Sequence, residues 1–69
     1  MNIRLIWGIL KHRKCSANEL AEHLGISKSS VYRKLWGQSE FTRAEILTMR
    51  KVLKLSYGDI IKIFFYDEG

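Results

Sequence analysis

Three capping boxes divide this chain into segments that can each begin a helix. Each box pairs a hydroxyl residue with an acid three positions later, and the pairs are Ser16/Glu19, Thr42/Glu45 and Ser56/Asp59. In such a box the hydroxyl oxygen accepts a hydrogen bond from the third helical N–H, while the acid accepts one from the N–H of the hydroxyl residue. Ser27 is a fourth candidate cap, because serine is preferred just before a first helical turn.

Between the caps, apolar residues recur at spacings of three and four, which is typical of one face of a helix. The chain contains no proline, and Gly25 and Gly37 stand where helices are expected to stop. We therefore expect an all-α chain of five helices, at residues 2–13, 17–24, 28–36, 43–53 and 57–65.

The same spacing predicts a hydrophobic core and a surplus of apolar residues at the end of the chain. The expected core residues are Leu5, Ile6, Ile9, Leu10, Leu20, Ala21, Leu24, Ile26, Val31, Leu35, Ile46, Leu47, Met49, Val52, Leu53, Leu55, Ile60, Ile61 and Phe64. Ile63, Phe65 and Tyr66 are left outside this core, so residues 62–69 are predicted to form an apolar tail. Either another chain covers the tail, as is usual for a large apolar patch, or the tail forms a short strand that folds back.

Size and charge limit the class of protein. The 69 residues suffice for one domain, residues 1–69, and the net charge of +5 suggests a polyanionic partner. A single cysteine, Cys15, excludes an intramolecular disulfide and fits a reducing compartment. The apolar run at residues 5–10 is too short for a signal segment or a membrane span. We expect a cytoplasmic protein with no membrane association.

No constellation of residues favours catalysis or metal binding. His12, Cys15 and His23 are the only soft metal ligands, whereas a structural zinc site needs four. The sequence contains no nucleophile elbow, no phosphate-binding loop and no paired carboxylate motif. We therefore predict that the chain is not an enzyme and needs no metal, cofactor or small-molecule substrate.

Residues 19–35 have the mechanical properties of two short helices joined by a tight turn. Ala21 is small enough for a close helix contact, and Gly25 can adopt a positive φ that ends the first helix. Val31 and Leu35 are four residues apart and would hold the second helix on the core. An outer face then remains, formed by Lys28, Ser29, Tyr32, Arg33 and Trp36. A helix with a polar outer face fits the major groove of DNA.

This segment resembles the lambda-repressor/Cro-like helix-turn-helix family of the xenobiotic-response-element type. The likeness is carried by Glu19-Leu20-Ala21, Leu24-Gly25-Ile26-Ser27 and Val31. It extends from Leu5 to Ile61, since Leu47 to Asp59 resembles the family's fourth helix and the turn into the fifth. The resemblance implies a five-helix DNA-binding domain of the kind common in phage repressors and Cro proteins, which usually bind as dimers.

The resemblance also assigns expected roles to individual residues. Lys28, Ser29 and Arg33 would contact bases, and Tyr32 would contact a thymine methyl group or a phosphate. The expected phosphate contacts are Ser16, Asn18, Lys34, Ser39 and Arg43. Other interpretations remain open: a solvated helix face for Lys28 and Arg33, local packing for Tyr32 and Trp36, and helix capping for Ser16 and Thr42.

The chain departs from the family pattern at four positions. Ala17 stands where the family often has a glutamine that helps to hold a phosphate, a role that Asn18 or Ser16 would have to take over. Lys54 replaces a usual glycine, and Arg50 replaces a small core residue. Trp36 is larger than the usual residue near the end of the recognition helix.

Together these features predict a sequence-specific transcription regulator, similar to phage Cro proteins and repressors, that reads double-stranded operator DNA with helix 28–36 as a homodimer. The alternative is an antirepressor that uses the same fold and its apolar tail to form a hetero-complex with a cognate repressor. A protein that lies on a membrane surface is a weaker third interpretation, because the positive charge is spread over several helices.

Overall fold

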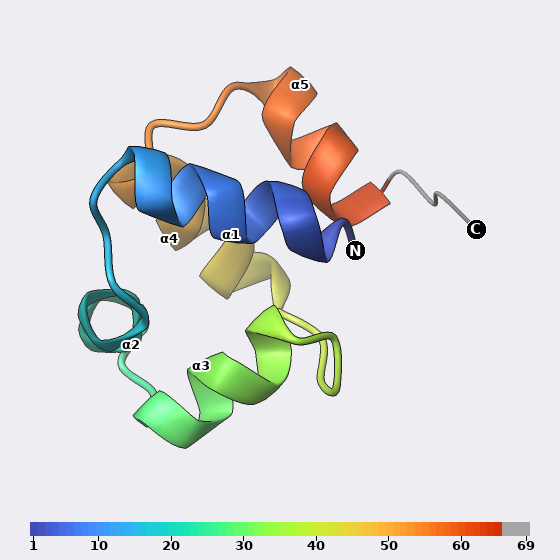
Figure 1. Cartoon of the computed structure of the whole chain (residues 1–69). Helices are drawn as coiled ribbons and strands as arrows, with labels where there is room; N and C mark the ends of the chain where they lie inside the picture. Colours follow the sequence, from blue (N-terminus) through green and yellow to red (C-terminus); the bar gives the residue numbers. More distant parts are fainter. Residues whose placement is uncertain (66–69) are drawn as a thin grey trace.

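The structure is a computed structural model that describes residues 1–65. It contains five α-helices and a final π-helical turn: α1 (Ile3–His12), α2 (Ala17–Leu24), α3 (Lys28–Leu35), α4 (Arg43–Val52), α5 (Tyr57–Ile60) and η1 (Ile61–Phe65). No strand occurs within these residues. The predicted all-α, five-helix fold is therefore confirmed, and α2 and α3 lie together on one side of α1 (Figure 1).

Each α-helix begins at a side chain that caps its first turn. All three predicted capping boxes are present, and Ser27 caps α3 by accepting a hydrogen bond from the N–H of Ser30 at 3.1 Å. α1 begins at Asn2, whose side-chain oxygen accepts from the N–H of Leu5 at 3.1 Å. These local bonds satisfy backbone donors that have no partner inside the helix, which explains why the helix starts follow the sequence pattern.

Four helices end at a residue with a left-handed backbone. Gly25 and Gly37, with φ of 69° and 82°, end α2 and α3. Lys14 and Lys54, with φ of 54° and 53°, follow the ends of α1 and α4. In each case the next N–H donates to a carbonyl five residues back, the Schellman pattern. Lys54 thus adopts the backbone that its family glycine would supply, although a side chain makes that conformation less favourable.

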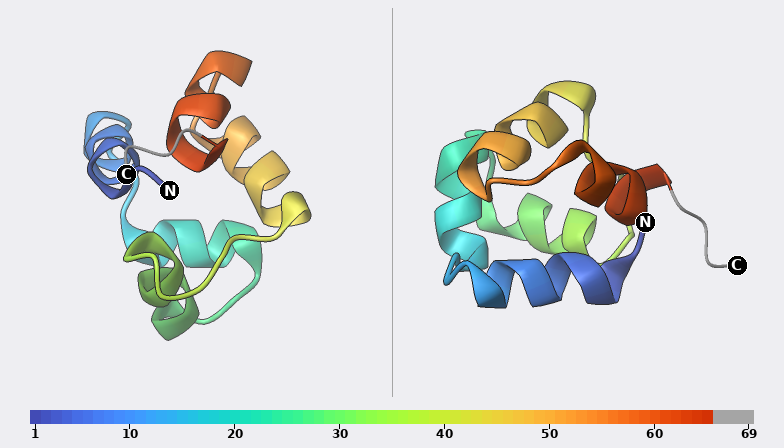
Figure 2. Two further views of the ribbon diagram at one scale, coloured as in Figure 1. Left: turned by 90° about the vertical axis from the view of Figure 1, so that its right-hand side faces the viewer. Right: turned by 90° about the horizontal axis from the view of Figure 1, so that it is seen from above.

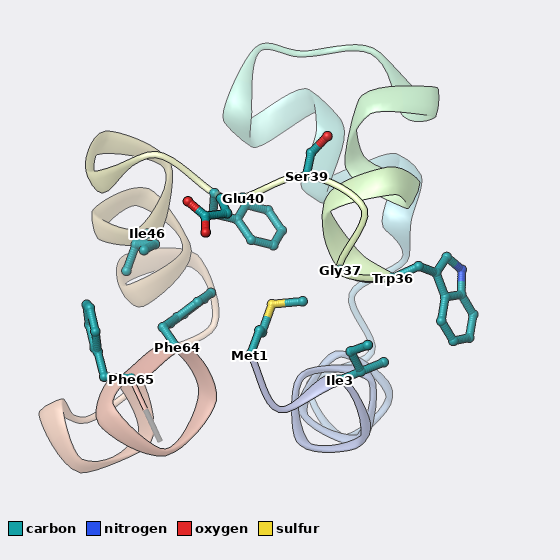
Figure 3. A pocket seen from close by; sticks show the side chains of 10 residues that line it. Met1, Ile3, Trp36, Gly37, Ser39, Glu40, Ile46, Phe64 and Phe65 are labelled. Atoms are coloured by element: carbon teal, nitrogen blue, oxygen red, sulfur yellow. The ribbon is translucent and has the colours of Figure 1, made fainter. Parts of the chain in front are cut away.

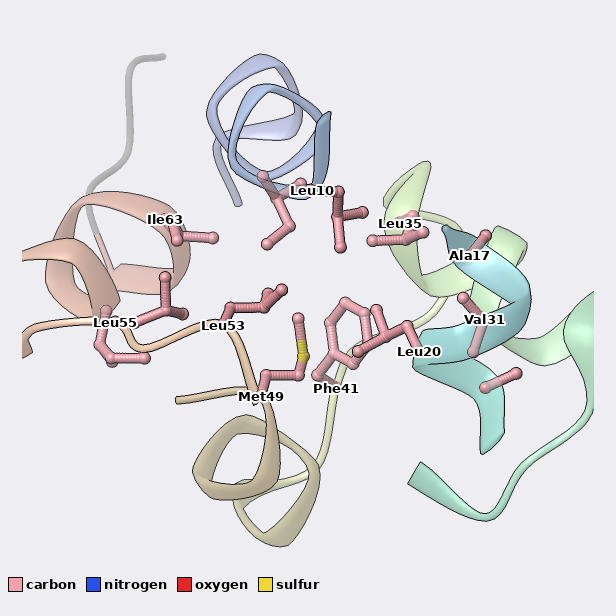
Figure 4. Packing of buried hydrophobic residues seen from close by; sticks show 13 residues of the cluster. Leu10, Ala17, Leu20, Val31, Leu35, Phe41, Met49, Leu53, Leu55 and Ile63 are labelled. Carbon is pink, nitrogen blue, oxygen red and sulfur yellow. The ribbon is translucent and has the colours of Figure 1, made fainter. Parts of the chain in front are cut away.

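The buried side chains of all the helices meet in one core, which Figure 4 shows from close by. Ten predicted core residues are confirmed as buried: Ile6, Leu10, Leu20, Ala21, Val31, Leu35, Met49, Leu53, Leu55 and Ile60. Ala17, Phe41 and Ile63 are also buried, although they were not predicted. Leu47 and Ile61 were predicted wrongly, because both side chains are about half exposed, at 49% and 56%.

The end of the chain differs from the prediction at Ile63. Ile63 and Phe64 lie three and four residues after Ile60, on the same helical face, whereas Ile61 is turned about 100° away from it. Ile63 is fully buried and cannot belong to a free apolar surface. Its carbonyl accepts a hydrogen bond from the N–H of Asn2 at 2.6 Å, and Figure 2 shows the N-terminus beside η1 in both views. Phe65 is exposed; Tyr66, and the rest of the predicted tail after Phe65, lie outside the described residues.

Two further observations concern the described residues alone. None of their helices is long and apolar enough to cross a membrane. No group of three His, Cys, Asp or Glu side chains within residues 1–65 is arranged to hold a metal ion. Cys15 is partly buried at the corner between α1 and α2, where burial and the nearby Glu19 carboxylate raise the pKa of its thiol.

Candidate nucleic-acid interface

The turn between α2 and α3 holds the two helices in a fixed relation. Gly25 adopts φ 69°, and the N–H of Ile26 donates to the carbonyl of Ala21 at 3.2 Å. A Cβ atom on Gly25 would meet no other atom within 4 Å. The positive φ, and not a lack of space, is therefore the reason for a glycine at this position. Ser27 follows directly and caps α3.

Helix α3 is anchored on one side and exposed on the other. Val31 and Leu35 are fully buried in the core. The four predicted base-contact residues, Lys28, Ser29, Tyr32 and Arg33, are all exposed, and their spacing sets them on one face of α3. The core thus fixes the orientation of a polar and basic helix face of the width that a major groove admits.

The predicted phosphate-contact residues lie at helix starts and in one loop. Ser16 and Asn18 stand at the first turn of α2, where the Ser16 hydroxyl is engaged in the capping box. Arg43 is exposed at the first residue of α4. Ser39 lies partly buried in the loop between α3 and α4. The N–H groups at a helix start favour a bound anion, so Asn18 and Arg43 are suitably placed.

Lys34 differs from the other predicted phosphate contacts, because its charge is already paired. Its Nζ donates to both carboxylate oxygens of Glu45, at 2.7 and 2.8 Å, and the two side chains are only 15% and 12% exposed. The Lys34 ammonium also lies 6.0 Å from the centre of the Phe41 ring. Lys34 therefore connects the recognition helix to the start of α4 instead of presenting a free charge on the outer face.

The Glu45 carboxylate is the acid of the α4 capping box as well as the partner of Lys34. Burial raises the pKa of Glu45, but hydrogen bonds from Lys34 and Thr42 outweigh that effect, and the net pKa lies below its ordinary value of 4.5. A carboxyl group whose pKa is lowered on folding stabilises the fold above its unfolded pKa. That stability is lost as the pH falls through the folded pKa.

We expect Glu45→Gln to lower the free energy of unfolding by about 1–2 kcal/mol at pH 7, since a hydrogen bond to a charged group is lost. The glutamine oxygen can still accept from the N–H of Thr42, so the cap is kept. Urea unfolding from pH 7 to below pH 4 measures the effect, which should be complete above about pH 4.5 and shrink as the pH falls from there through the lower pKa of the folded wild-type carboxyl. Glu40→Gln, at an exposed acid, is the control. Equal losses for both variants at pH 7 would contradict the role of the ion pair.

An aromatic residue that the sequence analysis did not assign lies against the recognition helix. Trp7 of α1 is partly buried, and its ring centre lies 6.1 Å from that of Tyr32 and 5.1 Å from that of Trp36. We call these three residues the aromatic cluster. Trp7 stands three residues before Leu10, and this helical spacing from a core residue is the signal that could have found it. Tyr32 and Trp36 therefore pack locally, although both remain exposed on their outer side.

A pocket of about 470 Å³ lies between the end of α3, the following loop and η1 (Figure 3). Its walls mix polar and apolar surface, and the residues that line it are Met1, Ile3, Trp36, Gly37, Ser39, Glu40, Phe41, Ile46, Phe64 and Phe65. Ser39 belongs to this wall. The pocket adjoins the candidate interface at Trp36 and the end of η1 at Phe65.

A second exposed feature runs along α5 and η1. Tyr57, Ile61 and Phe65 are each four residues apart and more than half exposed, and we call them the apolar stripe. The guanidinium of Arg50, on α4, lies 4.3 Å from the centre of the Tyr57 ring. Residues four apart share a helical face, so these three side chains form one exposed apolar surface. The sequence analysis had expected Ile63, which is buried, to belong to such a surface.

Comparison with known proteins agrees with this geometry. A family model described as the Cro/C1-type HTH DNA-binding domain matches residues 5–65. No curated protein and no solved structure gives a significant match.

Proposed function

The chain belongs to the Cro/C1-type helix-turn-helix family of DNA-binding regulators, and from this premise we propose that it is a sequence-specific repressor that occupies operator DNA. In this proposal α3 enters the major groove, as recognition helices of this type do. We further propose a phage origin, by likeness to Cro proteins, and action in the cytoplasm.

One observation carries the proposal, namely the exposed basic face of a helix whose opposite side is fully buried. Lys28 and Arg33 are donors suited to the O6 and N7 acceptors of guanine, and Ser29 can bond to any base edge. Asn18 and Arg43, with Ser39, would hold the phosphates on either side of the groove, whereas the Ser16 hydroxyl already donates to the Glu19 carboxylate at 3.2 Å. We leave Lys34 out of this set, because its ammonium is bound to Glu45.

A salt series tests the proposal. Each protomer brings three cations to the proposed interface, namely Lys28, Arg33 and Arg43. If each of them neutralises one DNA phosphate charge, the logarithm of affinity should fall with the logarithm of salt at a slope of about −2.7 per protomer, at about −0.9 for each charge. That slope corresponds to a loss of about 40-fold between 50 and 200 mM salt. A gel-shift titration on duplexes selected from random DNA measures it. A flat response, or no binding at 50 mM salt, would overturn the proposed function.

Two variants that remove the same charge separate base recognition from general attraction. Arg33→Ala should cost about 1–3 kcal/mol on the selected operator and much less on random DNA, because a base contact carries sequence preference. Lys51→Ala removes an equal charge from an exposed site in the last turn of α4 and should change neither affinity appreciably. Equal losses for the two variants on both DNAs would show that α3 does not read bases.

We also propose that the protein acts as a homodimer that pairs through the apolar stripe. Exposed apolar side chains on one helical face favour an isologous contact with a second copy. Phe65, predicted from the sequence as an interface residue, belongs to the stripe, and Tyr57 and Ile61 take the place of the buried Ile63. Two recognition helices paired in this way would meet successive major grooves about 34 Å apart.

The second candidate function is an antirepressor. Ala17, which lacks the side chain to hold a phosphate, and the exposed indole of Trp36 favour it. In this case the apolar stripe would bind a cognate repressor in place of a second copy. Sedimentation of the protein alone and with a candidate repressor separates the two functions, because only the antirepressor forms the mixed species.

A further inference from the structure

The aromatic cluster connects a helix that has no assigned role in DNA binding to the centre of the recognition face. Trp7 comes from α1, whereas Tyr32 lies on the exposed side of α3 and Trp36, four residues later, directly follows that helix. Trp7 is partly buried below the two rings, and 55% of Trp36 is exposed. Trp7 is therefore the support in this arrangement, and the other two rings present accessible surface.

The Trp7 indole is held by ring contacts and not by a hydrogen bond. Its Nε1 is buried, and within the described residues it has no hydrogen-bond partner. A buried donor without a partner lowers stability. A side chain without the indole N–H would therefore stabilise the fold at least as well. What the indole adds is a broad, flat surface against which Tyr32 and Trp36 rest.

Tyr32 presents its ring on the face of α3 that would lie toward the bases in the proposed complex. It lies on the same exposed face as Lys28 and Arg33, and the Lys28 ammonium lies 5.9 Å from the centre of its ring. The edges of the base pairs in the major groove offer hydrogen-bonding atoms and one apolar group, the C5-methyl of thymine. A ring fixed between two cationic base-contact residues is therefore matched to that methyl group.

Resting on the proposed function, we propose that Tyr32 recognises a thymine methyl group and that Trp7 is the positioning residue that holds the ring for it. A ring already packed in one rotamer loses little conformational freedom on binding. The thymine lies next to the base pairs that Lys28 and Arg33 contact. Trp7 touches no DNA in this arrangement and acts through the other two rings.

Replacement of each thymine in the selected operator by deoxyuridine tests the proposal, because it removes the methyl group alone. The wild type should lose about fourfold in affinity at one or two positions, the value of one buried methyl group. Trp7→Leu should abolish this preference while its affinity for the uracil operator stays within about twofold of the wild type. Trp7→Phe, which keeps a ring, should retain the preference. Ile9→Val changes α1 at a residue that points about 200° away from Trp7 around the helix, and it serves as the matched control.

Each result then has one meaning. Equal wild-type affinity for the thymine and uracil operators at all positions, or a preference kept in Trp7→Leu, would overturn this inference while leaving DNA binding intact. Thermal unfolding checks that the variants fold, and Trp7→Met, which fills the space without a ring, replaces Trp7→Leu if that variant does not. A wild type that binds no DNA at all would overturn the proposed function and this inference with it.

Discussion

Phe65→Asp is expected to reduce the affinity for an operator with two half-sites by about 10²- to 10⁴-fold, the range over which linked binding exceeds single binding. A carboxylate in the middle of the paired stripes would have to be buried without a partner, which is strongly unfavourable. In the wild type 71% of the Phe65 side chain is exposed. The substitution should therefore leave the free energy of unfolding of the protomer within about 0.5 kcal/mol of the wild type.

Sedimentation and gel shift together measure this effect. The wild type should sediment as a dimer and Phe65→Asp as a monomer, with similar affinities for a single half-site. Phe65→Leu, which keeps an apolar side chain, is the control and should remain dimeric. A wild type that stays monomeric at all concentrations, with DNA binding unchanged by Phe65→Asp, would show that the stripe is not a pairing surface.

Ile63→Ala should have the opposite profile, with a large loss of stability and no direct effect on pairing. Ile63 is fully buried, and the removal of a buried isoleucine side chain to alanine costs about 2–5 kcal/mol. At about 0.05–0.15 kcal/mol per residue, a domain of this size has a total stability of only about 3–10 kcal/mol, so the substitution should remove a large part of it. Urea unfolding of Ile63→Ala beside Phe65→Ala measures the contrast. If Ile63→Ala lowered the free energy of unfolding by less than about 1 kcal/mol, the side chain would not belong to the core, because core truncations of this kind cost more.

Helix starts and ends could be predicted from the sequence because their causes are local. A cap such as Ser16 and its acid Glu19 are three residues apart, and both hydrogen bonds of the box lie within one turn. The left-handed ends at Gly25 and Gly37 are likewise set by single residues. The same reasoning placed the four predicted base-contact residues on one face of α3, because helical spacing determines a face without knowledge of the neighbours.

Contacts between distant residues could not be predicted in this way. The pairing of Lys34 with Glu45 depends on how α3 meets α4, and the packing of Trp7 against Tyr32 and Trp36 depends on how α1 crosses α3. Each of these two contacts changes the expected role of a residue in or next to α3, and neither is marked by a pattern in the neighbouring sequence. The error at Ile63 has a different origin, since the spacing from Ile60 favoured Ile63 and Phe64 over Ile61 from the start.

The hydrogen bond from the N–H of Asn2 to the carbonyl of Ile63 has a consequence for how the fold opens. Asn2 is also the N-cap of α1, so unwinding of η1 removes a contact from the residue that starts the first helix. This bond couples the start of α1 to η1, so we expect these two segments to open together, whereas terminal helices usually fray independently. We therefore expect amide exchange at the start of α1 to follow that of η1, and a second copy bound over η1 to slow the exchange in both.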